Sequence, residues 1–240
     1  MTEQGISVRQ SEVWDSWAKG RPGRARKNAK GAASWFNWTI YPDTGPGVEV
    51  LGELDDTRRV LDLGCGAGAN LAHVTGLAPE SQGVDSSSVQ VRKAEERYPE
   101  ITVWCDDAVR FLETSPAPFH MIYSVYAAGW YINPDDLLPA VLERLAPGGR
   151  YAFSQNPPVL PECVGPQGSV FAPAQEGGAP MYLPRWDYPP DEWERRLKTA
   201  GFVNVTHQHI PSPCGKKLGT MLITADKPGT LPSLPGVPRR

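Results

Sequence analysis

Apolar and polar positions follow two different periods through the middle of the chain. Short apolar runs predict five β-strands, at 59–63, 81–85, 102–105, 121–125 and 150–154. The stretches between them predict helices near 70–76, 88–98, 108–113 and 136–145. The last helix carries an apolar stripe made of Leu137, Leu138, Val141, Leu142 and Leu145. Strands that alternate with helices indicate an α/β fold, with a parallel sheet covered by helices on both faces.

The segments on either side of this region have weaker patterns. Residues 1–52 contain several tryptophans and no regular spacing, so we expect an irregular N-terminal arm. Residues 155–190 are rich in Pro and Gly, and structureless stretches of this length are usually lids, binding loops or disordered segments. The elements expected after them are a helix and two strands, at 191–200, 203–210 and 218–225. We therefore expect one domain at 53–225 and a flexible tail at 226–240.

The composition narrows the class of protein. The net charge of −3 argues against a dedicated nucleic-acid-binding protein, because such proteins usually have a strongly basic face. The cysteines Cys65, Cys105, Cys163 and Cys214 form no Cys-x-x-Cys pair, so we expect reduced thiols. The first residues lack the apolar stretch of a signal peptide, and the longest apolar run, 121–132, is too short to span a membrane. We therefore expect a cytoplasmic protein with no membrane partner.

A glycine-rich turn follows the first predicted strand, in the sequence Arg59-Val-Leu-Asp-Leu-Gly-Cys-Gly-Ala-Gly-Ala-Asn70. Gly64, Gly66 and Gly68 let a ligand lie directly against the backbone, because no Cβ intervenes. The helix that begins near Asn70 adds unpaired N–H groups and the positive end of its dipole. Strand, turn and helix together predict the floor of a cofactor site.

Two kinds of cofactor fit this turn at first sight. Gly64, Gly66 and Ala69 satisfy the dinucleotide fingerprint G-x-G-x-x-G/A, so a nicotinamide cofactor has to be weighed. Asp62, at the end of the strand, favours a different ligand. Its carboxylate repels a pyrophosphate, and it attracts a ligand that carries an ammonium and a sulfonium group.

Three further motifs occur in order after the turn: Gly83-Val-Asp85, Cys105-Asp-Asp-Ala108 and Leu145-Ala-Pro-Gly-Gly149. Together with Val60-Leu-Asp-Leu-Gly-Cys-Gly-Ala-Gly68, they resemble the class I S-adenosylmethionine-dependent methyltransferases over about residues 58–225. The resemblance implies a Rossmann-like fold with a seven-stranded, mostly parallel sheet and S-adenosyl-L-methionine as cofactor. It also implies that the N-terminal arm folds over the cofactor as a lid and that the Pro- and Gly-rich loop shapes the substrate site.

The resemblance assigns roles to particular positions. The cofactor-binding residues that it implies are Asp62, Gly64, Cys65, Gly66, Gly68, Asn70, Asp85, Ser86, Gln90, Asp106, Asp107, Ala108 and Ser124. The turn would face the methionine portion through its backbone, and Asp85 would accept hydrogen bonds from both ribose hydroxyls. Ser124 would offer a backbone carbonyl near the sulfonium. Which of Asp106 and Asp107 reads the adenine edge stays open, and an ordinary helix cap is the alternative role for these acids.

The methylated atom is harder to predict. Many amino-methylating relatives carry Asn/Asp-Pro-Pro-Tyr/Phe after the fourth strand, whereas this chain has Ser124-Val-Tyr-Ala-Ala there. Asn156-Pro-Pro follows the fifth strand instead. A catalytic metal is not expected, because the end of the fourth strand offers no carboxylate before Asp135. The catalytic role stays unassigned, with four candidates: Tyr126, Trp130, His207 and His209.

Aromatic residues gather in three segments that we expect to wall an acceptor pocket. The substrate-binding residues expected on this ground are Trp14, Trp38, Tyr41, Tyr126, Trp130, Tyr131, Tyr182 and Trp186. A π-rich pocket of this kind suits a flat or glycosylated small molecule. The alternative is that several tryptophans only hold the N-terminal arm onto the core.

The expected function is methyl transfer to an O-, N- or C-nucleophile of a small molecule, in bacterial specialised metabolism such as antibiotic biosynthesis. Six basic residues and no acid lie within 19–30, which leaves open a macromolecular or carrier-bound acceptor held by this arm. A nucleic acid is the less favoured partner because of the net charge. A third hypothesis is a non-catalytic cofactor-binding protein that regulates a partner. The oligomeric state stays open.

Overall fold

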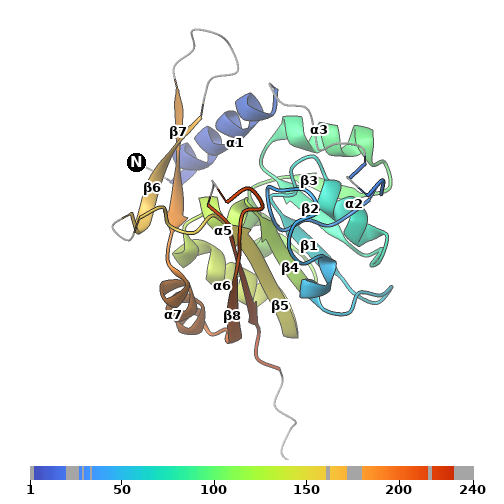
Figure 1. The fold of residues 1–240 in the computed structure, drawn as a ribbon. Coiled ribbons are helices and arrows are strands. Elements are labelled where there is room, and N and C mark those ends of the chain that lie inside the picture. The colour runs from blue at the N-terminus through green and yellow to red at the C-terminus, as the bar shows by residue number, and fades with distance from the viewer. Residues whose placement is uncertain are drawn as a thin grey trace, which may run out of the picture.

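A seven-stranded sheet forms the centre of the molecule, in the order β3-β2-β1-β4-β5-β9-β8 (Figure 1). The computed structural model describes residues 3–19, 27–28, 30–32, 34–160, 163–171, 180–215 and 218–229, without the side chains of 3–9. The strands are β1 (Val60–Leu63), β2 (Gln82–Asp85), β3 (Thr102–Cys105), β4 (Phe119–Val125), β5 (Leu145–Gln155), β8 (Val203–Ile210) and β9 (Thr220–Asp226). The first five are parallel, and β9 runs antiparallel to both of its neighbours. The predicted seven-stranded, mostly parallel α/β sheet is confirmed.

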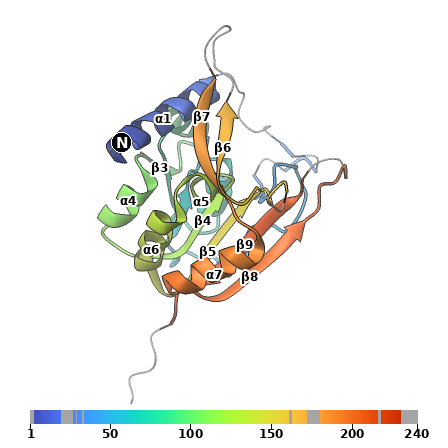
Figure 2. The same ribbon diagram turned by 90° about the vertical axis from the view of Figure 1, so that its left-hand side faces the viewer.

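Helices cover both faces of this sheet, as the alternating pattern predicts. The helices of one face are α4 (Ala108–Thr114), α6 (Pro134–Arg144) and α7 (Pro190–Ala200), which Figure 2 shows in front of the strands. The other face carries α2 (Ala69–Thr75), α3 (Ser88–Arg97) and the short helix η1 (Val48–Leu51). One further short helix, α5 (Ala128–Tyr131), follows β4 directly.

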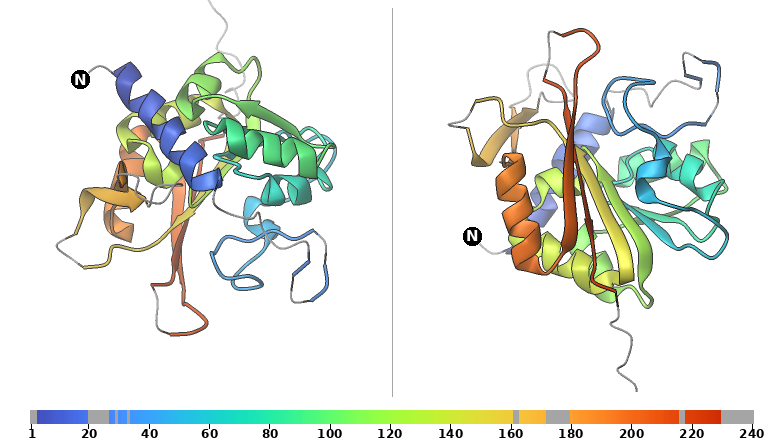
Figure 3. Two further views of the ribbon diagram at one scale, coloured as in Figure 1. Left: turned by 90° about the horizontal axis from the view of Figure 1, so that it is seen from above. Right: turned by 60° about the horizontal axis from the view of Figure 1, so that its bottom comes forward.

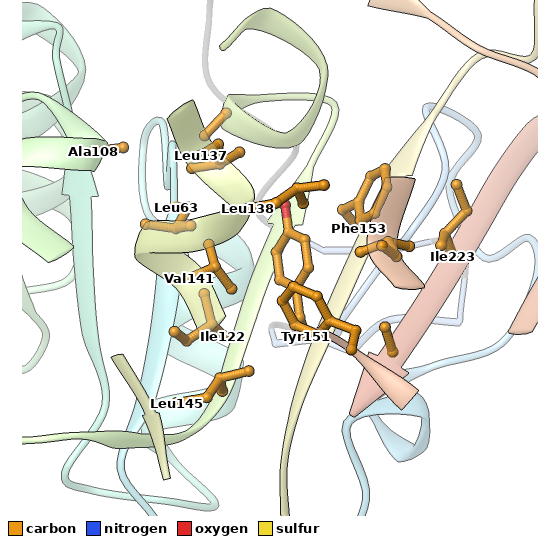
Figure 4. Close-up of a cluster of buried hydrophobic side chains, with 14 of the residues drawn as sticks. Leu63, Ala108, Ile122, Leu137, Leu138, Val141, Leu145, Tyr151, Phe153 and Ile223 are labelled. Carbon is orange, nitrogen blue, oxygen red and sulfur yellow. The ribbon is translucent and has the colours of Figure 1, made fainter. Parts of the chain in front are cut away.

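The larger part of the core lies between the sheet and α4, α6 and α7. Figure 4 shows Leu63, Ile122 and Phe153 of the strands pointing at Leu137, Leu138 and Val141 of α6. This contact confirms the apolar stripe predicted for α6, although the helix ends at Arg144 and the last member of the stripe, Leu145, begins β5. Neighbouring strand residues point to opposite faces. Val60 therefore packs in the second cluster, with Val74 of α2 and Phe36, while Leu61 and Leu63 pack in the first.

Two segments predicted to be irregular are regular, which corrects the sequence analysis. Residues Glu3–Lys19 form the helix α1, and Gly165–Phe171 and Met181–Asp187 form an antiparallel hairpin, β6 and β7. In the hairpin, Ser169 and Leu183 are buried, while the paired Val170 and Tyr182 are each 65% exposed. This alternation has the strand period, but the interspersed Pro and Gly residues conceal it in the sequence. Among the described side chains of α1, only Val13 and Ala18 are buried, so its apolar period is weak.

Parts of the predicted flanking segments lie outside the described residues. These are 20–26 and 29 of the basic stretch, 161–162 and 172–179 of the Pro- and Gly-rich segment, and 230–240 of the tail. Within the part of the chain that the structure describes, no helix is both long enough and apolar enough to cross a membrane.

Gly83 of β2 provides a test of the packing between the sheet and α2. A Cβ at Gly83 would lie 2.6 Å from Leu71 Cδ2 and 2.8 Å from Cys65 Sγ, so Gly83→Ala forces these side chains apart. We expect the free energy of unfolding to fall by about 1–3 kcal/mol, the usual cost of overpacking a core. Urea denaturation measures it. Gly168→Ala in β6 is the control, because a Cβ there meets nothing within 4 Å. Equal stability of the two variants would contradict this packing.

Candidate functional site

A cavity of about 330 Å³ lies at the carboxyl ends of β1, β2, β3 and β4. In open parallel sheets this edge is where ligands bind. Its floor is the glycine-rich turn, one wall is the α5 region, and its cover is α1 (Figure 3). The cavity therefore lies between the edge of the parallel sheet and the N-terminal helix α1.

The turn after β1 presents its backbone to this cavity. The N–H groups of Gly64 and Cys65 both donate to the Val84 carbonyl, at 2.8 and 3.1 Å, which holds the turn against β2. Gly66 has a φ of +55°. A Cβ there would meet only Gln90 Nε2, at 3.8 Å, and Gln90 lines the cavity too. The missing side chain of Gly66 thus leaves space for a ligand.

Other residues of the turn serve the fold. Gly68 has a φ of +77°, and a Cβ there would lie 2.6 Å from Ile101 Cδ1, so Gly68 packs against the core and its ligand contact stays a prediction. The Cys65 side chain also packs inward, with Leu71. Asn70 lines the cavity, and its side chain exchanges hydrogen bonds with the Asn37 backbone at 3.1 and 3.2 Å. Asn70 therefore ties α2 to the N-terminal segment.

Two backbone N–H groups hold the side chain of Asp85 in place. Its Oδ2 accepts a hydrogen bond from the Gly66 N–H at 2.9 Å, and its Oδ1 accepts one from the Ser87 N–H at 2.8 Å. Burial raises the pKa of Asp85 to about 6, the negative Asp15 adds to the rise, and the two backbone donors oppose it. Asp85 thus joins the turn after β1 to the start of α3 and still faces the cavity.

Three more carboxylates line the cavity, and they have different partners. Asp62 is 3% exposed. Asp107 caps α4, because its Oδ1 accepts hydrogen bonds from the N–H groups of Val109 and Arg110, each at 3.0 Å. Asp106 pairs with the Arg110 guanidinium. The helix-cap alternative therefore holds for Asp107.

The cavity has a negative lining. Lys93 is the one lysine or arginine among its described lining residues, against four aspartates. Lys93 Nζ donates to the Ala18 carbonyl of α1 at 2.5 Å. A lining of this kind attracts cationic ligands and repels phosphates.

Helix α1 closes the cavity from above. Trp14 packs edge-on against Tyr131, with ring centroids 4.8 Å apart, and against Phe171 of β6 at 5.0 Å. Gln10 Nε2 donates to the Tyr131 carbonyl at 3.2 Å. Figures 1 and 2 show α1 beside β7, and Figure 3 shows it crossing this edge of the sheet. Gln10, Trp17 and Ala18 were not predicted as site residues, because only a helix over 3–19 brings them there. Lys93 of α3 was not predicted either.

The segment after β4 forms one wall of the cavity. Its lining residues are Val125, Ala127, Ala128, Tyr131 and Ile132. Ser124 is fully buried; its Oγ donates to the Leu63 carbonyl at 2.9 Å and accepts from the Gly129 N–H at 3.0 Å. The Ser124 hydroxyl therefore holds this wall against β1. The next residue, Val125, lines the cavity in its place.

Several predicted catalytic and substrate residues have structural partners. Tyr126 is held at a φ of +55°, and its hydroxyl lies 2.6 Å from Thr220 Oγ1. The Trp130 indole donates to Asp187 Oδ1 at 2.6 Å. His207 and His209 are exposed on β8. This strand forms the edge of the sheet, and β5 and β9 separate it from β4.

Among the predicted aromatic wall residues, the structure brings Trp14 and Tyr131 together at the cavity. The prediction for Trp38 is wrong, because its ring is 0% exposed and its indole N–H donates to the Gly47 carbonyl at 2.8 Å. The Tyr41 hydroxyl donates to the Leu218 carbonyl at 3.0 Å. Tyr182 and Trp186 lie on the hairpin strand β7. Among the described residues, no group of three His, Cys, Asp or Glu is placed to hold a metal ion.

Comparisons with known proteins agree with this geometry. Residues 45–222 match the protein family described as "Methyltransferase domain". A trans-aconitate 2-methyltransferase of Azoarcus sp. (strain BH72) is 31% identical over 144 residues, which cover 56% of this chain and 56% of that protein. One from Variovorax paradoxus (strain S110) is 32% identical over 114 residues, 46% of this chain and 44% of that protein. The chain therefore spans about half the length of the curated relatives it matches.

A solved structure shares the fold. It is an S-adenosylmethionine-dependent methyltransferase from Clostridium acetobutylicum ATCC 824, with a TM-score of 0.55 at 17% identity. The alignment covers 75% of this chain and 88% of that chain. Such a low identity supports the fold alone.

The cysteines test the placement of the turn. Cys65 is buried, and burial beside Asp62 and Asp85 raises the pKa of its thiol well above the ordinary value. Cys214 is exposed. Because the thiolate is the reactive form, we expect iodoacetamide to alkylate Cys214 long before Cys65 in the folded protein. A time course read by peptide mass spectrometry measures both rates. Equal rates would contradict the inward packing of the Cys65 side chain.

Proposed function

The chain belongs to the methyltransferase-domain family, and from this premise we propose that it transfers the methyl group of S-adenosyl-L-methionine to a small-molecule acceptor. The observation that carries the proposal is the negative, glycine-floored cavity in which the buried Asp85 is held by two backbone donors. A pyrophosphate-bearing dinucleotide fits this lining poorly. Of the two kinds of cofactor considered for the glycine-rich turn, the lining therefore favours the cationic S-adenosylmethionine over a dinucleotide.

The residues present fit this cofactor on four counts. The open space at Gly66 receives the methionine portion against the backbone. Asp85 has a carboxylate near the end of β2 that offers its remaining lone pairs to a ribose diol. The adenine would lie near Ala108 at the start of α4, beside Asp106. Asp62 supplies the negative charge for the ammonium group.

The chemistry divides between the cofactor and the chain. When bound, S-adenosylmethionine supplies an electrophilic methyl group on its sulfonium. The chain contributes orientation and the exclusion of water, because α1 lies over the cavity and Trp14 seals it against Tyr131. We therefore base the proposed catalysis on positioning, and we assign no catalytic role to the four candidates. Tyr126 and Trp130 make structural hydrogen bonds, and His207 and His209 are exposed on β8 at the edge of the sheet.

The size of the enclosed space favours a small acceptor. Gln10 and Trp14 of α1 line the cavity together with Tyr131 and Ile132. A cavity of about 330 Å³ is at the lower end of the range for small-molecule sites. The names of the curated relatives make trans-aconitate the first acceptor to test. A role in specialised metabolism or antibiotic biosynthesis, and a cytoplasmic location, stay predictions.

Asp85 is the residue by which cofactor binding can be tested. We expect Asp85→Ala to weaken the binding of S-adenosylhomocysteine by at least about tenfold, because hydrogen bonds to a charged group contribute about 1.5–3 kcal/mol each. Isothermal titration calorimetry measures the change. Asp56→Asn, at an exposed loop acid, is the matched control and keeps the wild-type affinity. An unchanged affinity in Asp85→Ala would remove the ribose assignment.

Methyl transfer itself is tested with S-adenosylmethionine labelled in its methyl group. The purified chain is incubated with trans-aconitate and, separately, with a cell extract divided by size. We expect label to appear in trans-aconitate or in the low-molecular-weight fraction. Label confined to protein or RNA would contradict the small-molecule proposal. Cofactor binding with no labelled product in any fraction would favour the non-catalytic hypothesis.

A further inference from the structure

Asp15 of α1 binds the first turn of another helix, α3. Its Oδ1 accepts hydrogen bonds from Ser87 Oγ at 2.6 Å and from the Val89 N–H at 3.1 Å. Its Oδ2 accepts one from Ser88 Oγ at 3.2 Å. A carboxylate is favourable at this end of a helix, where N–H groups lack partners and the dipole is positive. Asp15 thus acts as a cap that comes from a distant part of the chain.

Ser87 connects this carboxylate to the site. It donates its N–H to Asp85 and its hydroxyl to Asp15, so one residue bridges two carboxylates. The same hydroxyl oxygen accepts a hydrogen bond from the Gln90 N–H at 3.2 Å, which caps α3. The position of Asp85 therefore depends on a turn that α1 holds from outside.

The neighbours of Asp15 on α1 cover the cavity. Trp14 and Ala18 line it, and the Ala18 carbonyl accepts the hydrogen bond from Lys93 of α3. The contacts that hold α1 on α3 therefore also hold the residues that cover the cavity.

We infer that Asp15 is a positioning residue for cofactor binding. Through Ser87 it fixes the turn that presents Asp85. Its negative charge also acts on Asp85, so the binding of a ribose diol by Asp85 depends on the docking of α1. The inference rests on the proposed function, because it takes Asp85 as the ribose acceptor. It adds a residue outside the glycine-rich turn and the strand ends to the binding machinery.

The titratable groups around Asp85 come from four elements, and the two thiols among them are neutral because their pKa values are raised. These groups are Asp15 on α1, Asp62 and Cys65 at the end of β1, Cys105 and Asp106 at the end of β3, and Lys93 on α3. Burial is the main cause that raises the pKa of Asp85 to about 6, and the negative charge of Asp15 contributes a smaller part of the rise. The carboxylate form, which accepts both ribose hydroxyls, dominates above this pH. Cofactor affinity therefore falls as the pH falls through about 6.

The sign of the Asp15 effect follows from its charge. A neutral side chain at this position lowers the pKa of Asp85, so the loss of affinity moves to a lower pH. A purely structural role for Asp15 makes a different prediction. Weaker docking of α1 then lowers the affinity by the same factor at every pH, and the profile keeps its midpoint.

The test compares Asp15→Asn, Ser88→Ala and Glu12→Gln with the wild type. S-adenosylhomocysteine binding is measured by calorimetry from mildly alkaline to mildly acidic pH, and circular dichroism checks each fold. We expect Asp15→Asn to lose about tenfold in affinity at neutral pH, the loss that one charge-assisted hydrogen bond brings, and to shift its profile to lower pH. Ser88→Ala keeps the charge of Asp15 and removes one donor, so it weakens binding without a shift. Glu12→Gln changes an exposed carboxylate of the same helix and leaves the profile unchanged.

Each outcome is decisive. A profile of Asp15→Asn with the wild-type midpoint overturns the inference while the proposed function stands. If Asp15→Asn does not fold, Ser88→Ala decides, because wild-type affinity in that variant shows that the contact does not shape the site. A wild type that binds no S-adenosylhomocysteine at any pH overturns the proposed function, and the inference with it.

Discussion

The hydrogen bonds that Asp85 accepts from the N–H groups of Gly66 and Ser87 are the interaction on which the site depends. They keep a carboxylate in place where burial opposes its charge, and they join three elements: the turn after β1, the end of β2 and the start of α3. Gly66 reaches this bond with a φ of +55°, a conformation that glycine adopts at little cost. The cavity is open above Gly66 because no Cβ fills it.

The rest of the molecule keeps this junction fixed and covered. The buried hydroxyl of Ser124 fixes the α5 wall to β1, and Asp107 caps α4 at the opposite side of the cavity. Helix α1 contacts both α3 and the hairpin: Asp15 accepts a hydrogen bond from Ser87 Oγ at the start of α3, and the adjacent Trp14 packs against Tyr131 and Phe171. These contacts support the proposal that a small acceptor reacts in this negative cavity.

The sequence predicts the parallel sheet and the glycine-rich turn well, because both depend on local patterns. Val60 to Leu63 is a short apolar run before Gly64, and Asp85 stands at the end of another, so both reach the same sheet edge. The cover of the cavity is different. Gln10 and Ala18 carry no motif, and they reach the site only because Asp15 docks α1 on α3.

Burial distinguishes the aromatic residues that line the cavity from those that pack in the core, and residue type does not. Trp14 and Trp38 are equal candidates in the sequence, yet Trp14 lines the cavity and Trp38 is enclosed with Phe36 and Tyr123. Tyr126 illustrates the same limit, because its hydroxyl finds Thr220 of β9, which lies 94 residues further along the chain. Contacts of this range are set by the tertiary fold, and no local pattern encodes them.

A crystal structure of the protein with S-adenosylhomocysteine tests the central claim most directly. The account predicts both ribose hydroxyls at about 3 Å from the carboxylate oxygens of Asp85, with the amino-acid portion against Gly66 and Trp14 above it. A nucleoside bound elsewhere, or bound here with its ribose turned away from Asp85, would contradict it.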